Sequence, residues 1–422
     1  MQSGHRIQNN VSLSAETFKR IQTNFYEHQH HSAQSTPTNQ STEWCVDNVV
    51  LTTDMWTSRA TEAYLTVSCH MIDENWQMVA YVLETCYVPG QHTADNICAQ
   101  LTRITEEWGI KEKILAVVTD DAANMVAAVR KAGWKHYPCF AHTLNLVVKD
   151  SIKALPDLLE LQQKSSAIVA FFHHSTKAAD KLKDIQKQQK FPEQKLIQAV
   201  ETRWNSTFYM WERLLEQKEA VTTVLCLLGK SSLCLNEEEW SVIRLSINAL
   251  RPFEEATREM STEKHVSVSK VIPLVSLLLR TTKTSESQGS KLAAQLSGHC
   301  HRRFNSIETF YGFAVWAASS QPAAKGGIWE EFDTQVLASQ QHRTTGTDAL
   351  IEMRRYTEER PIPQDQDPLL WWKNNEQTFP SLSNLAKKYL TVVATSVPAE
   401  RIFSKAGQLV SNRRNALKAK KS

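Results

Sequence analysis

The feature that most constrains the fold is one change in the spacing of apolar residues, close to residue 154. Before that point, segments with the continuous or alternating apolar residues typical of strands stand between segments with helical spacing. From Leu155 to about Arg280 only helical spacing remains, as over 155–172, 211–228 and 237–257. The sequence therefore predicts an α/β sheet domain followed by a large all-α block.

The segments before residue 154 define the predicted sheet. Residues 46–54 (VDNVVLTTD) are nearly continuously apolar before a carboxylate, as expected for a strand buried on both faces. Residues 64–71 alternate, which predicts one inward and one outward face. Two more strands are predicted over 76–87 and 114–120, and helices over 93–108, 122–132 and 140–152. This order predicts a mixed sheet whose leading strands are antiparallel.

Four parts of the chain follow from these patterns. Residues 1–44 are rich in Gln, Asn, His, Ser and Thr, and we expect a disordered or linker segment with one short helix over 13–26. Residues 45–153 form the first part of the α/β core. Residues 154–357 are the mainly helical insertion, with loops predicted over 281–300 and 319–327. Residues 358–422 begin with a proline-rich linker and are helical again.

Composition and charge exclude several classes of protein. Lys and Arg total 48 and Asp and Glu 45, so the net charge of +3 does not by itself indicate nucleic-acid binding. The first residues do not resemble a signal peptide, and the longest apolar run, 271–279, contains a proline. We therefore expect a soluble, intracellular protein without a membrane partner. The eight cysteines never occur as CxxC, which predicts neither a disulfide scaffold nor a zinc site, but mostly free, buried thiols.

Two carboxylates end apolar strands, Asp54 in the first and Asp120 in the fourth. If those strands are neighbours, both carboxylates lie at one edge of the sheet, where carboxylate oxygens can bind Mg²⁺ or Mn²⁺. Two such ions assist in-line displacement at a phosphodiester. The alternative is that each Asp only caps the turn that follows its strand.

Glu400 is the third candidate ligand. Ser396 and Pro398 are typical of a helix start, and an apolar stripe at helical spacing follows, which includes Ile402, Phe403 and Leu409. The stripe would either pack this helix on the sheet, which places Glu400 in its first turn, or take part in dimerisation. An acidic residue in a first turn is also favoured by the helix dipole alone.

Two further motifs could bind a metal or DNA. Cys139 and His142 form a CxxH motif, but no second ligand pair stands at a suitable spacing, so packing of a buried Cys and a hydrogen-bonded His is favoured over zinc binding. Arg203 and Trp204 place a guanidinium beside an indole, a pair that can hold a phosphate and stack on an exposed base. Filling of the core is the alternative for Trp204.

Two stretches are locally basic. Six lysines between 177 and 195 are accompanied by three acidic residues, as on a solvated helix face. Residues 401–421 contain seven basic residues and no acidic one, which makes that stretch the better candidate for phosphate contact or nuclear import.

Taken together, several motifs resemble one family. The stretches are TTDMWTSRATEAYLTVSCHMID, VVTDDAANMVAAV, CFAHTLNLVV, ETRWNST, DPLLWWKNNEQTFPSLSNLAKKYL and SVPAERIFSKAG. They are similar to the hAT transposases and their domesticated relatives, the BED-type zinc finger proteins, and they extend from about residue 45 to 417. The resemblance implies a ribonuclease H-like core interrupted by a large helical insertion, an α/β plus all-α fold, with a C-terminal hAT dimerisation region.

The resemblance also implies roles for these residues. Asp54, Asp120 and Glu400 match the family's catalytic and metal-binding acids. Cys139 and His142 match the family's CxxH motif. Trp204 matches a tryptophan of the insertion domain that stabilises a flipped base during hairpin formation.

The sequence departs from the family pattern in three places. Residues 1–44 contain no Cys, so they hold no zinc finger; residues 311–327 lack the usual strand-like segment; and KAKKS stands where relatives have an apolar helix. We therefore expect a transposase-derived nuclear protein that dimerises and associates with DNA in transcription or chromatin regulation, with catalysis weak or lost. The alternatives are an active Mg²⁺- or Mn²⁺-dependent DNA transposase and a purely structural interaction module. None of the three needs a small-molecule substrate.

Overall fold

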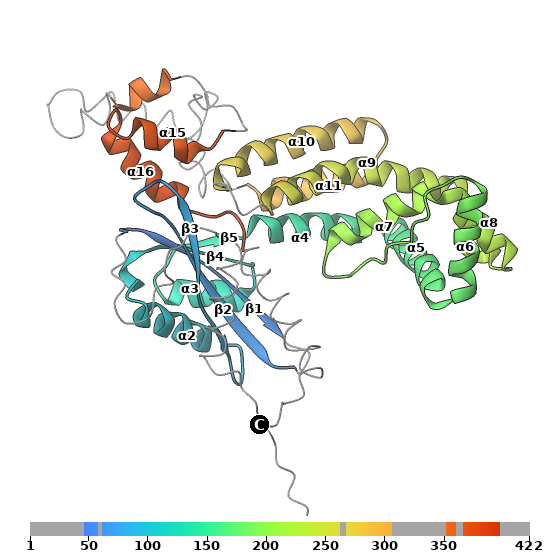
Figure 1. The fold of residues 1–422 in the computed structure, drawn as a ribbon, viewed down its shortest axis with the longest axis horizontal. Helices are drawn as coiled ribbons and strands as arrows, with labels where there is room; N and C mark the ends of the chain where they lie inside the picture. The colour runs from blue at the N-terminus through green and yellow to red at the C-terminus, as the bar shows by residue number, and fades with distance from the viewer. Residues whose placement is uncertain (1–45, 58–60, 262–266, 306–351, 360–365, 397–422) are drawn as a thin grey trace, which may run out of the picture.

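The computed structural model describes residues 46–57, 61–261, 267–305, 352–359 and 366–396 of the 422-residue chain. A five-stranded sheet forms one end of the molecule, and a long helical arm leads away from it (Figure 1). The strands are β1 (Val49–Thr57), β2 (Ala63–Ile72), β3 (Met78–Tyr87), β4 (Ile114–Thr119) and β5 (His136–Pro138).

The strand order is β3-β2-β1-β4-β5. β1 pairs antiparallel with β2 and β2 with β3, whereas β1 and β4, and β4 and β5, are parallel. The predicted mixed sheet with antiparallel leading strands is confirmed. Strand β5 was not predicted, because three residues that end in proline carry no readable alternation.

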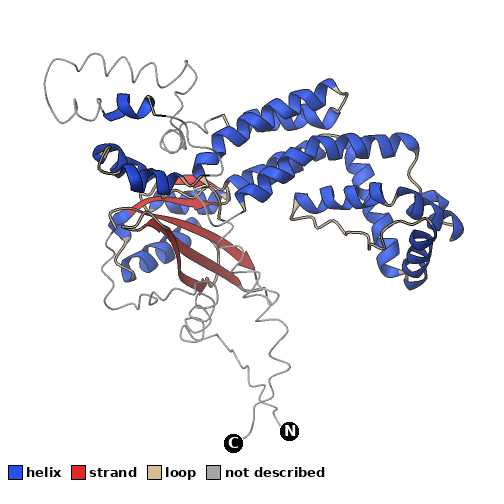
Figure 2. Cartoon of the chain, turned by 45° about the horizontal axis from the view of Figure 1, so that its top comes forward, coloured by secondary structure: helices blue, strands red, loops and turns tan. Residues whose placement is uncertain are grey.

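Helices cover both faces of the sheet (Figure 2). Helices α2 (Ala94–Glu107) and α3 (Ala123–Lys131) pack on one face, where Leu51, Val67 and Val117 are buried against them. Helix α4 (Phe140–Lys153) shares a core with the opposite face through Val50 and Val118. Helix α2 ends as predicted, because Gly109 adopts a left-handed φ of 64°.

The face of β2 that the alternation assigned to solvent is buried. Thr66, Ser68 and His70 are at most 2% exposed. The prediction of an outward face was therefore wrong, because the strand lies inside the sheet and both of its faces are covered. Polar residues on a covered face still alternate with apolar ones, so the pattern alone could not separate the two cases.

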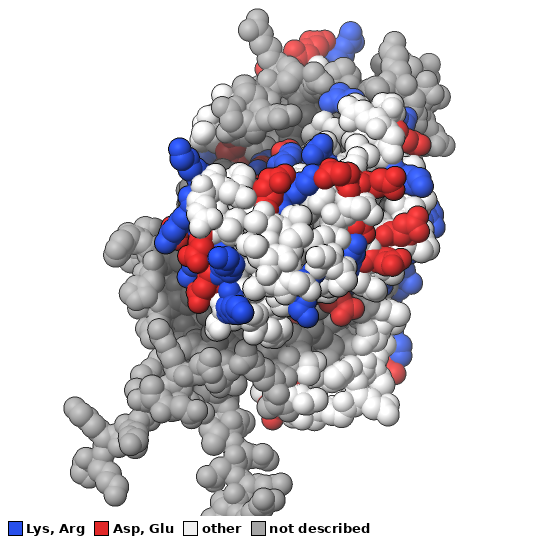
Figure 3. Space-filling view, turned by 90° about the vertical axis from the view of Figure 1, so that its right-hand side faces the viewer, with Lys and Arg blue, Asp and Glu red and all other residues white. Residues whose placement is uncertain are grey.

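The arm is helical from α4 onward, as predicted. One predicted helix, over 211–228, is two helices that meet at Gln217. In Figure 3, Lys and Arg side chains alternate with Asp and Glu over the described part of the visible face. The helices are α5 (Pro156–His174), α6 (Thr176–Gln188), α7 (Trp204–Glu216), α8 (Lys218–Leu227) and α9 (Glu237–Met260).

The predicted loop over 281–300 is wrong. Helix α10 (Val271–Ser287) extends into it, and α11 (Lys291–Arg303) begins after Ser290 and covers the rest. Thr282 fills a buried position in the last turns of α10, where an apolar residue would have continued the stripe in the sequence pattern. The apolar residues of α11 do have helical spacing, and they are buried: Leu292, Leu296 and Cys300.

The last described helices, α15 (Pro368–Asn375) and α16 (Pro380–Leu390), dock on the turn between β2 and β3. The ring of Trp76 in that turn stacks on Trp372, with the centroids 6.4 Å apart, and its Nε1 donates to Glu376 at 3.1 Å. Glu352 accepts the backbone N–H groups of Ser381 and Leu382 at the start of α16. Among the described residues, no helix is long and apolar enough to cross a membrane.

Candidate functional site

The pairing of β1 with β4 brings the two predicted carboxylates to one edge of the sheet. Thr52 of β1 is aligned with Val118 of β4 in a parallel register. Two residues farther along each strand direction, the same register aligns Asp54 with Asp120. Residues two apart along a strand point to the same face, so both carboxylates lie on the face of Thr52 and Val118. Both side chains are half-buried. The predicted adjacency of the strands is therefore present.

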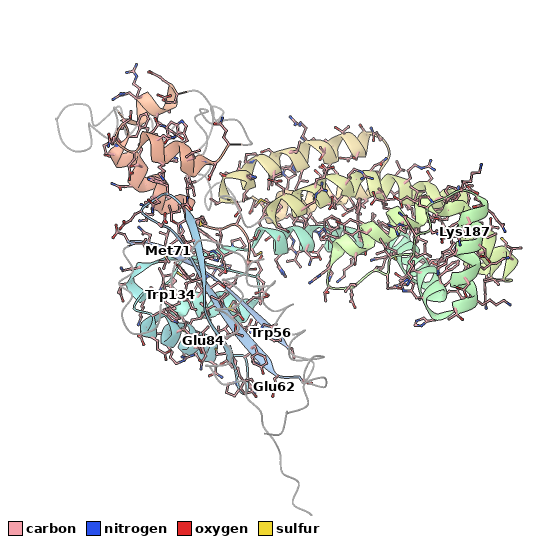
Figure 4. The ribbon with its side chains drawn as sticks, viewed as in Figure 1. Trp56, Glu62, Met71, Glu84, Trp134 and Lys187 are labelled. Carbon is pink, nitrogen blue, oxygen red and sulfur yellow. The ribbon has the colours of Figure 1, made fainter. Side chains whose placement is uncertain are left out.

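The position of Asp54 differs from the prediction in one respect. It does not end its strand, because β1 continues to Thr57 in pairing with β2, opposite Thr66. Figure 4 shows Trp56 farther along β1, where its ring stacks on Tyr64 with 4.8 Å between the centroids. β4 ends at Thr119, so β1 extends beyond the end of its parallel neighbour from Asp54 onward. The sequence could not show that two neighbours of one strand have different lengths.

A band of buried polar side chains lies on the same face as Asp54. Thr52 Oγ1 is 3.1 Å from Nε2 of His70, and Thr66 Oγ1 is 2.8 Å from Oγ1 of Thr85. Ser68 Oγ is buried without a hydrogen-bond partner. Burial lowers the pKa of His70 to about 4, so the ring is neutral at physiological pH. This band could not be recognised from the sequence, because the alternation along β2 places these residues on an outward face.

The backbone around Asp120 is fixed by its neighbours. Thr119 Oγ1 donates to the carbonyl oxygen of Asp120 at 2.5 Å and lies 2.9 Å from Nε2 of His136 on β5. Because the hydroxyl has a single proton, His136 Nε2 must be the donor in the second bond. Burial lowers the pKa of His136, while Asp121 and Asp120 oppose that shift. Oδ1 of Asp120 accepts the N–H of Ala122 at 3.4 Å before α3.

Cys139 joins the strand end, α4 and the C-terminal segment. Its N–H donates to the carbonyl oxygen of Thr119 at 2.8 Å, and its buried Sγ accepts the N–H of Ser396 at 3.4 Å. Phe140 N–H donates to the carbonyl oxygen of Ala394 at 2.8 Å. The chain at Ser396 is thus held beside the residue that precedes Asp120.

Glu400 follows Ser396 by four residues and lies outside the described part of the chain, as do Ile402, Phe403 and Leu409. Ser396, the last described residue before Glu400, is held next to Cys139. Within the described residues, no group of three or more His, Cys, Asp or Glu side chains could hold a metal ion. Asp54 and Asp120 supply hard oxygen ligands of the kind that Mg²⁺ prefers, and Glu400 would be the third.

The two members of the CxxH motif have different surroundings. Cys139 is buried, as the packing hypothesis predicts, and the N–H of Ser396 is its partner. His142 stands in the first turn of α4 and is half-buried, and its ring has no hydrogen bond to the described residues. The hydrogen bond predicted for the His142 ring is therefore not present among the described residues.

The Arg-Trp motif begins α7 and is tied to α4. The N–H of Trp204 donates to Oδ1 of Asn145 at 3.2 Å. Its indole ring is 3% exposed, and its Nε1 is buried without a partner. Arg203 is exposed in a tight turn, where Ser206 Oγ accepts the N–H of Val200 at 2.7 Å. The guanidinium is accessible to a phosphate, whereas the ring is packed in the core.

Of the two basic stretches, only residues 177–195 lie in the described part of the chain. Acidic residues stand among the lysines of the first stretch, and Lys187 of α6, which Figure 4 labels, forms an ion pair with Glu193 at 3.7 Å. Residues 401–421 lie outside the described residues. The first stretch is therefore a mixed-charge helix face.

Three family models match the chain in the order of its structural parts. Residues 52–133 match the ZBED1 RNase-like domain, residues 137–249 the ZBED1 RNase-like helical domain, and residues 352–422 the hAT family C-terminal dimerisation region. These matches and the observed sheet and arm confirm the predicted fold class, an α/β core with an all-α insertion and a C-terminal hAT region.

Curated proteins match over most of the chain. Zinc finger BED domain-containing protein 4 of Homo sapiens is 25% identical over 412 residues, which cover 84% of this chain and 35% of that protein. Putative AC transposase of Zea mays is 23% identical over 441 residues, 87% of this chain and 54% of that protein. Zinc finger BED domain-containing protein 6 of Mus musculus is 30% identical over 256 residues, 54% of this chain and 24% of that protein. The chain spans about a quarter to a half of these relatives.

Proposed function

The chain is a relative of the hAT transposases and BED-type zinc finger proteins, and from this premise we propose that it is a transposase-derived nuclear protein that self-associates and binds DNA. Its role would be in transcription or chromatin regulation, with strand cleavage weak or lost. The observation that carries this proposal is the combination of a matched dimerisation region with a Trp204 ring that is 3% exposed. A packed ring does not present a face on which a flipped base could stack.

The surface of the dimerisation region supports self-association through its aliphatic side chains. The aromatic residues of α15 and α16 are used within the chain, since Trp372 and Phe379 are buried. Leu370 on α15 is 59% exposed and Leu385 on α16 is 39% exposed. Exposed apolar side chains that gather in one patch mark a protein interface, and we expect these two leucines to belong to such a patch. A second copy of the chain would cover them, together with the predicted stripe of Ile402, Phe403 and Leu409.

DNA association would rest on cations at the edge of the arm and at the C-terminus. Arg203 is exposed in its turn. The acid-free stretch 401–421 adds positive charge that can neutralise backbone phosphates. Binding of this kind depends steeply on salt and carries little sequence preference. No base-reading element is proposed for the described part of the chain.

The second candidate is an active DNA transposase, and the register of β1 and β4 favours it. Asp54 and Asp120 stand at neighbouring positions, and Ser396 is held beside the strand end that precedes Asp120. Mg²⁺ or Mn²⁺ bound there would stabilise the charge that develops on the attacking and leaving oxygens of a phosphodiester. The chain's own part would be to hold the three carboxylates: Thr119 and His136 fix the backbone of Asp120, and Cys139 fixes the approach to Glu400.

One experiment separates the two candidates. Binding and cleavage of a labelled DNA duplex are measured with Mg²⁺ or Mn²⁺, on wild type and on the double variant Asp54→Asn with Asp120→Asn. We expect the same salt-sensitive binding for both proteins and no cleavage above that of the double variant. Cleavage by wild type alone would establish the active transposase. Absence of DNA binding by both, with Phe403→Asp abolishing self-association, would favour the purely structural interaction module.

A further inference from the structure

Two cysteines of the helical arm lie next to each other. Cys226 is in the last turn of α8, and Cys234 directly follows the short helix η2 (Ser231–Leu233). Their Sγ atoms are 3.9 Å apart. None of the seven described cysteines forms a disulfide, and no hydrogen bond joins any other two of them. This thiol pair has no part in the carboxylate site.

The backbone of the segment 226–234 holds the two thiols together. Gly229 has a φ of 66° and donates its N–H to the carbonyl oxygen of Cys226 at 3.1 Å, which closes α8. Cys234 donates its N–H to the carbonyl oxygen of Ser231 at 3.0 Å. Since a disulfide bond is about 2 Å long, the sulfur atoms need to approach by only about 2 Å. Rotation of the exposed Cys226 side chain about χ1 offers such a movement.

The pair differs from the other cysteines in its access to solvent. Cys226 is exposed and Cys234 is half-buried, whereas Cys69 and Cys300 are buried and burial raises the pKa of each thiol to about 12. Burial, and the hydrogen bond and charge of Cys226, raise the pKa of Cys234, which the ammonium of Lys164 partly opposes. Cys226 is therefore the thiol that a dissolved oxidant meets first.

We propose that Cys226 and Cys234 form a redox-active dithiol site, which a small disulfide such as oxidised glutathione converts to an intramolecular disulfide. The Cys226 thiolate attacks one sulfur of the oxidant, forms a mixed disulfide and releases one thiolate. The Cys234 thiolate then attacks Sγ of Cys226, expels the second thiolate and leaves the Sγ–Sγ bond. Two thiol protons pass to solvent and two electrons to the oxidant.

The bond would join the end of α8 to the segment that leads into α9. The start of α9 is already held to the start of α8 by an ion pair between Lys218 and Glu237 at 2.8 Å. A covalent closure of the segment 226–234 removes conformations from the unfolded arm and so stabilises the folded arm. Figure 1 places α8 at the end of the arm away from the sheet, so the redox state should leave the carboxylate site unchanged.

The test uses the full chain, equilibrated in buffers of defined reduced and oxidised glutathione, then alkylated and mapped by peptide mass spectrometry. We expect a Cys226–Cys234 cross-linked peptide that has lost two hydrogen atoms, and a higher thermal unfolding midpoint that a reductant reverses. Cys98→Ser, which removes a half-buried thiol of α2, is the matched control and should behave as wild type.

Two variants keep the proposal falsifiable. Cys234→Ser should carry glutathione on Cys226 and show no reversible rise in the unfolding midpoint, and Cys226→Ser should show neither. The proposal is overturned if both cysteines remain alkylated in wild type under conditions in which Cys234→Ser is glutathionylated. A stable mixed disulfide on Cys226 of wild type would overturn it as well, because Cys234 would then have failed to displace the thiolate.

Discussion

Ser396 donates its backbone N–H to Sγ of Cys139 at 3.4 Å, although the two residues lie 257 positions apart in the chain. Through this bond, the segment that leads to Glu400 is fixed to the junction between β4 and α4. Asp120 follows the strand residue Thr119, whose carbonyl oxygen accepts the N–H of Cys139. The cysteine of the CxxH motif thus connects two parts of the candidate site.

Removal of the Cys139 thiol should lower the free energy of unfolding by more than the loss of its packing contacts alone. Cys139→Ala leaves the buried N–H of Ser396 unpaired, which adds about 1–3 kcal/mol to the lost packing. Cys300→Ala is the control, since that thiol is also buried and donates or accepts no described hydrogen bond. Urea unfolding should therefore show a larger loss of stability for Cys139→Ala. Equal losses for the two variants would mean that the bond contributes nothing.

Stability should fall in mild acid because of His70. Its pKa is about 4 in the folded chain and about 6.5 when unfolded, so only the unfolded state binds the proton between these values. As pH falls from 6.5 to 4, the free energy of unfolding should decrease by about 3 kcal/mol on this account, with no further loss below. Measured against pH, wild type should show this slope and His70→Gln a shallower one. The burial of His136 lowers its pKa too and should leave a residual slope. Identical slopes would contradict the assignment.

The docking of α15 and α16 should depend on Trp76. Trp76→Ala removes the stack on Trp372 and the bond to Glu376, a large-to-small change that costs about 3–5 kcal/mol. Trp76→Phe keeps an aromatic ring and should lose about 1 kcal/mol through the missing Nε1 donor. Limited proteolysis should release residues 366–396 faster in Trp76→Ala than in Trp76→Phe. Tyr87→Ala, at a half-exposed ring on β3, should cleave as wild type does.

Self-association should depend on the exposed leucines of the dimerisation region. A charge buried without a partner in an interface is strongly unfavourable, so Leu370→Asp and Leu385→Asp should each weaken the dimer tenfold or more, about 1.4 kcal/mol. Leu227→Asp, at a leucine of the arm that is 60% exposed, is the matched control. Sedimentation at a series of protein concentrations measures the effect. If Leu227→Asp were the only variant to dissociate, the interface would lie on the arm.

Much of the fold could be predicted from apolar spacing. The parallel neighbours β1 and β4, the antiparallel leading strands and the change to helices near residue 154 are all present in the structure. The loop predicted over 281–300 was wrong because the segment is rich in Ser and Thr, and Thr282 fills a buried position of α10 where an apolar residue would have continued the stripe. Helix propensity and packing along α11 outweighed that composition.

The sequence could indicate single candidate residues of the site, but not the contacts between them. Asp54 and Asp120 were recognisable because each follows an apolar run. The roles of Asn145, Thr119 and His136 depend on contacts between elements that are distant in the sequence, and no local pattern encodes them. Burial of the Trp204 ring is equally a property of tertiary packing, since an exposed and a core tryptophan at a helix start look alike in sequence.

The most direct test of the account is calorimetric titration of the folded chain with Mn²⁺. Asp54→Asn and Asp120→Asn each remove one proposed ligand charge, and Asp121→Asn, at the exposed carboxylate next to Asp120, is the matched control. We expect wild type and Asp121→Asn to bind the ion and the other two variants to lose binding. No binding by folded wild type, or equal binding by all four proteins, would contradict the assignment of Asp54 and Asp120 to one metal site.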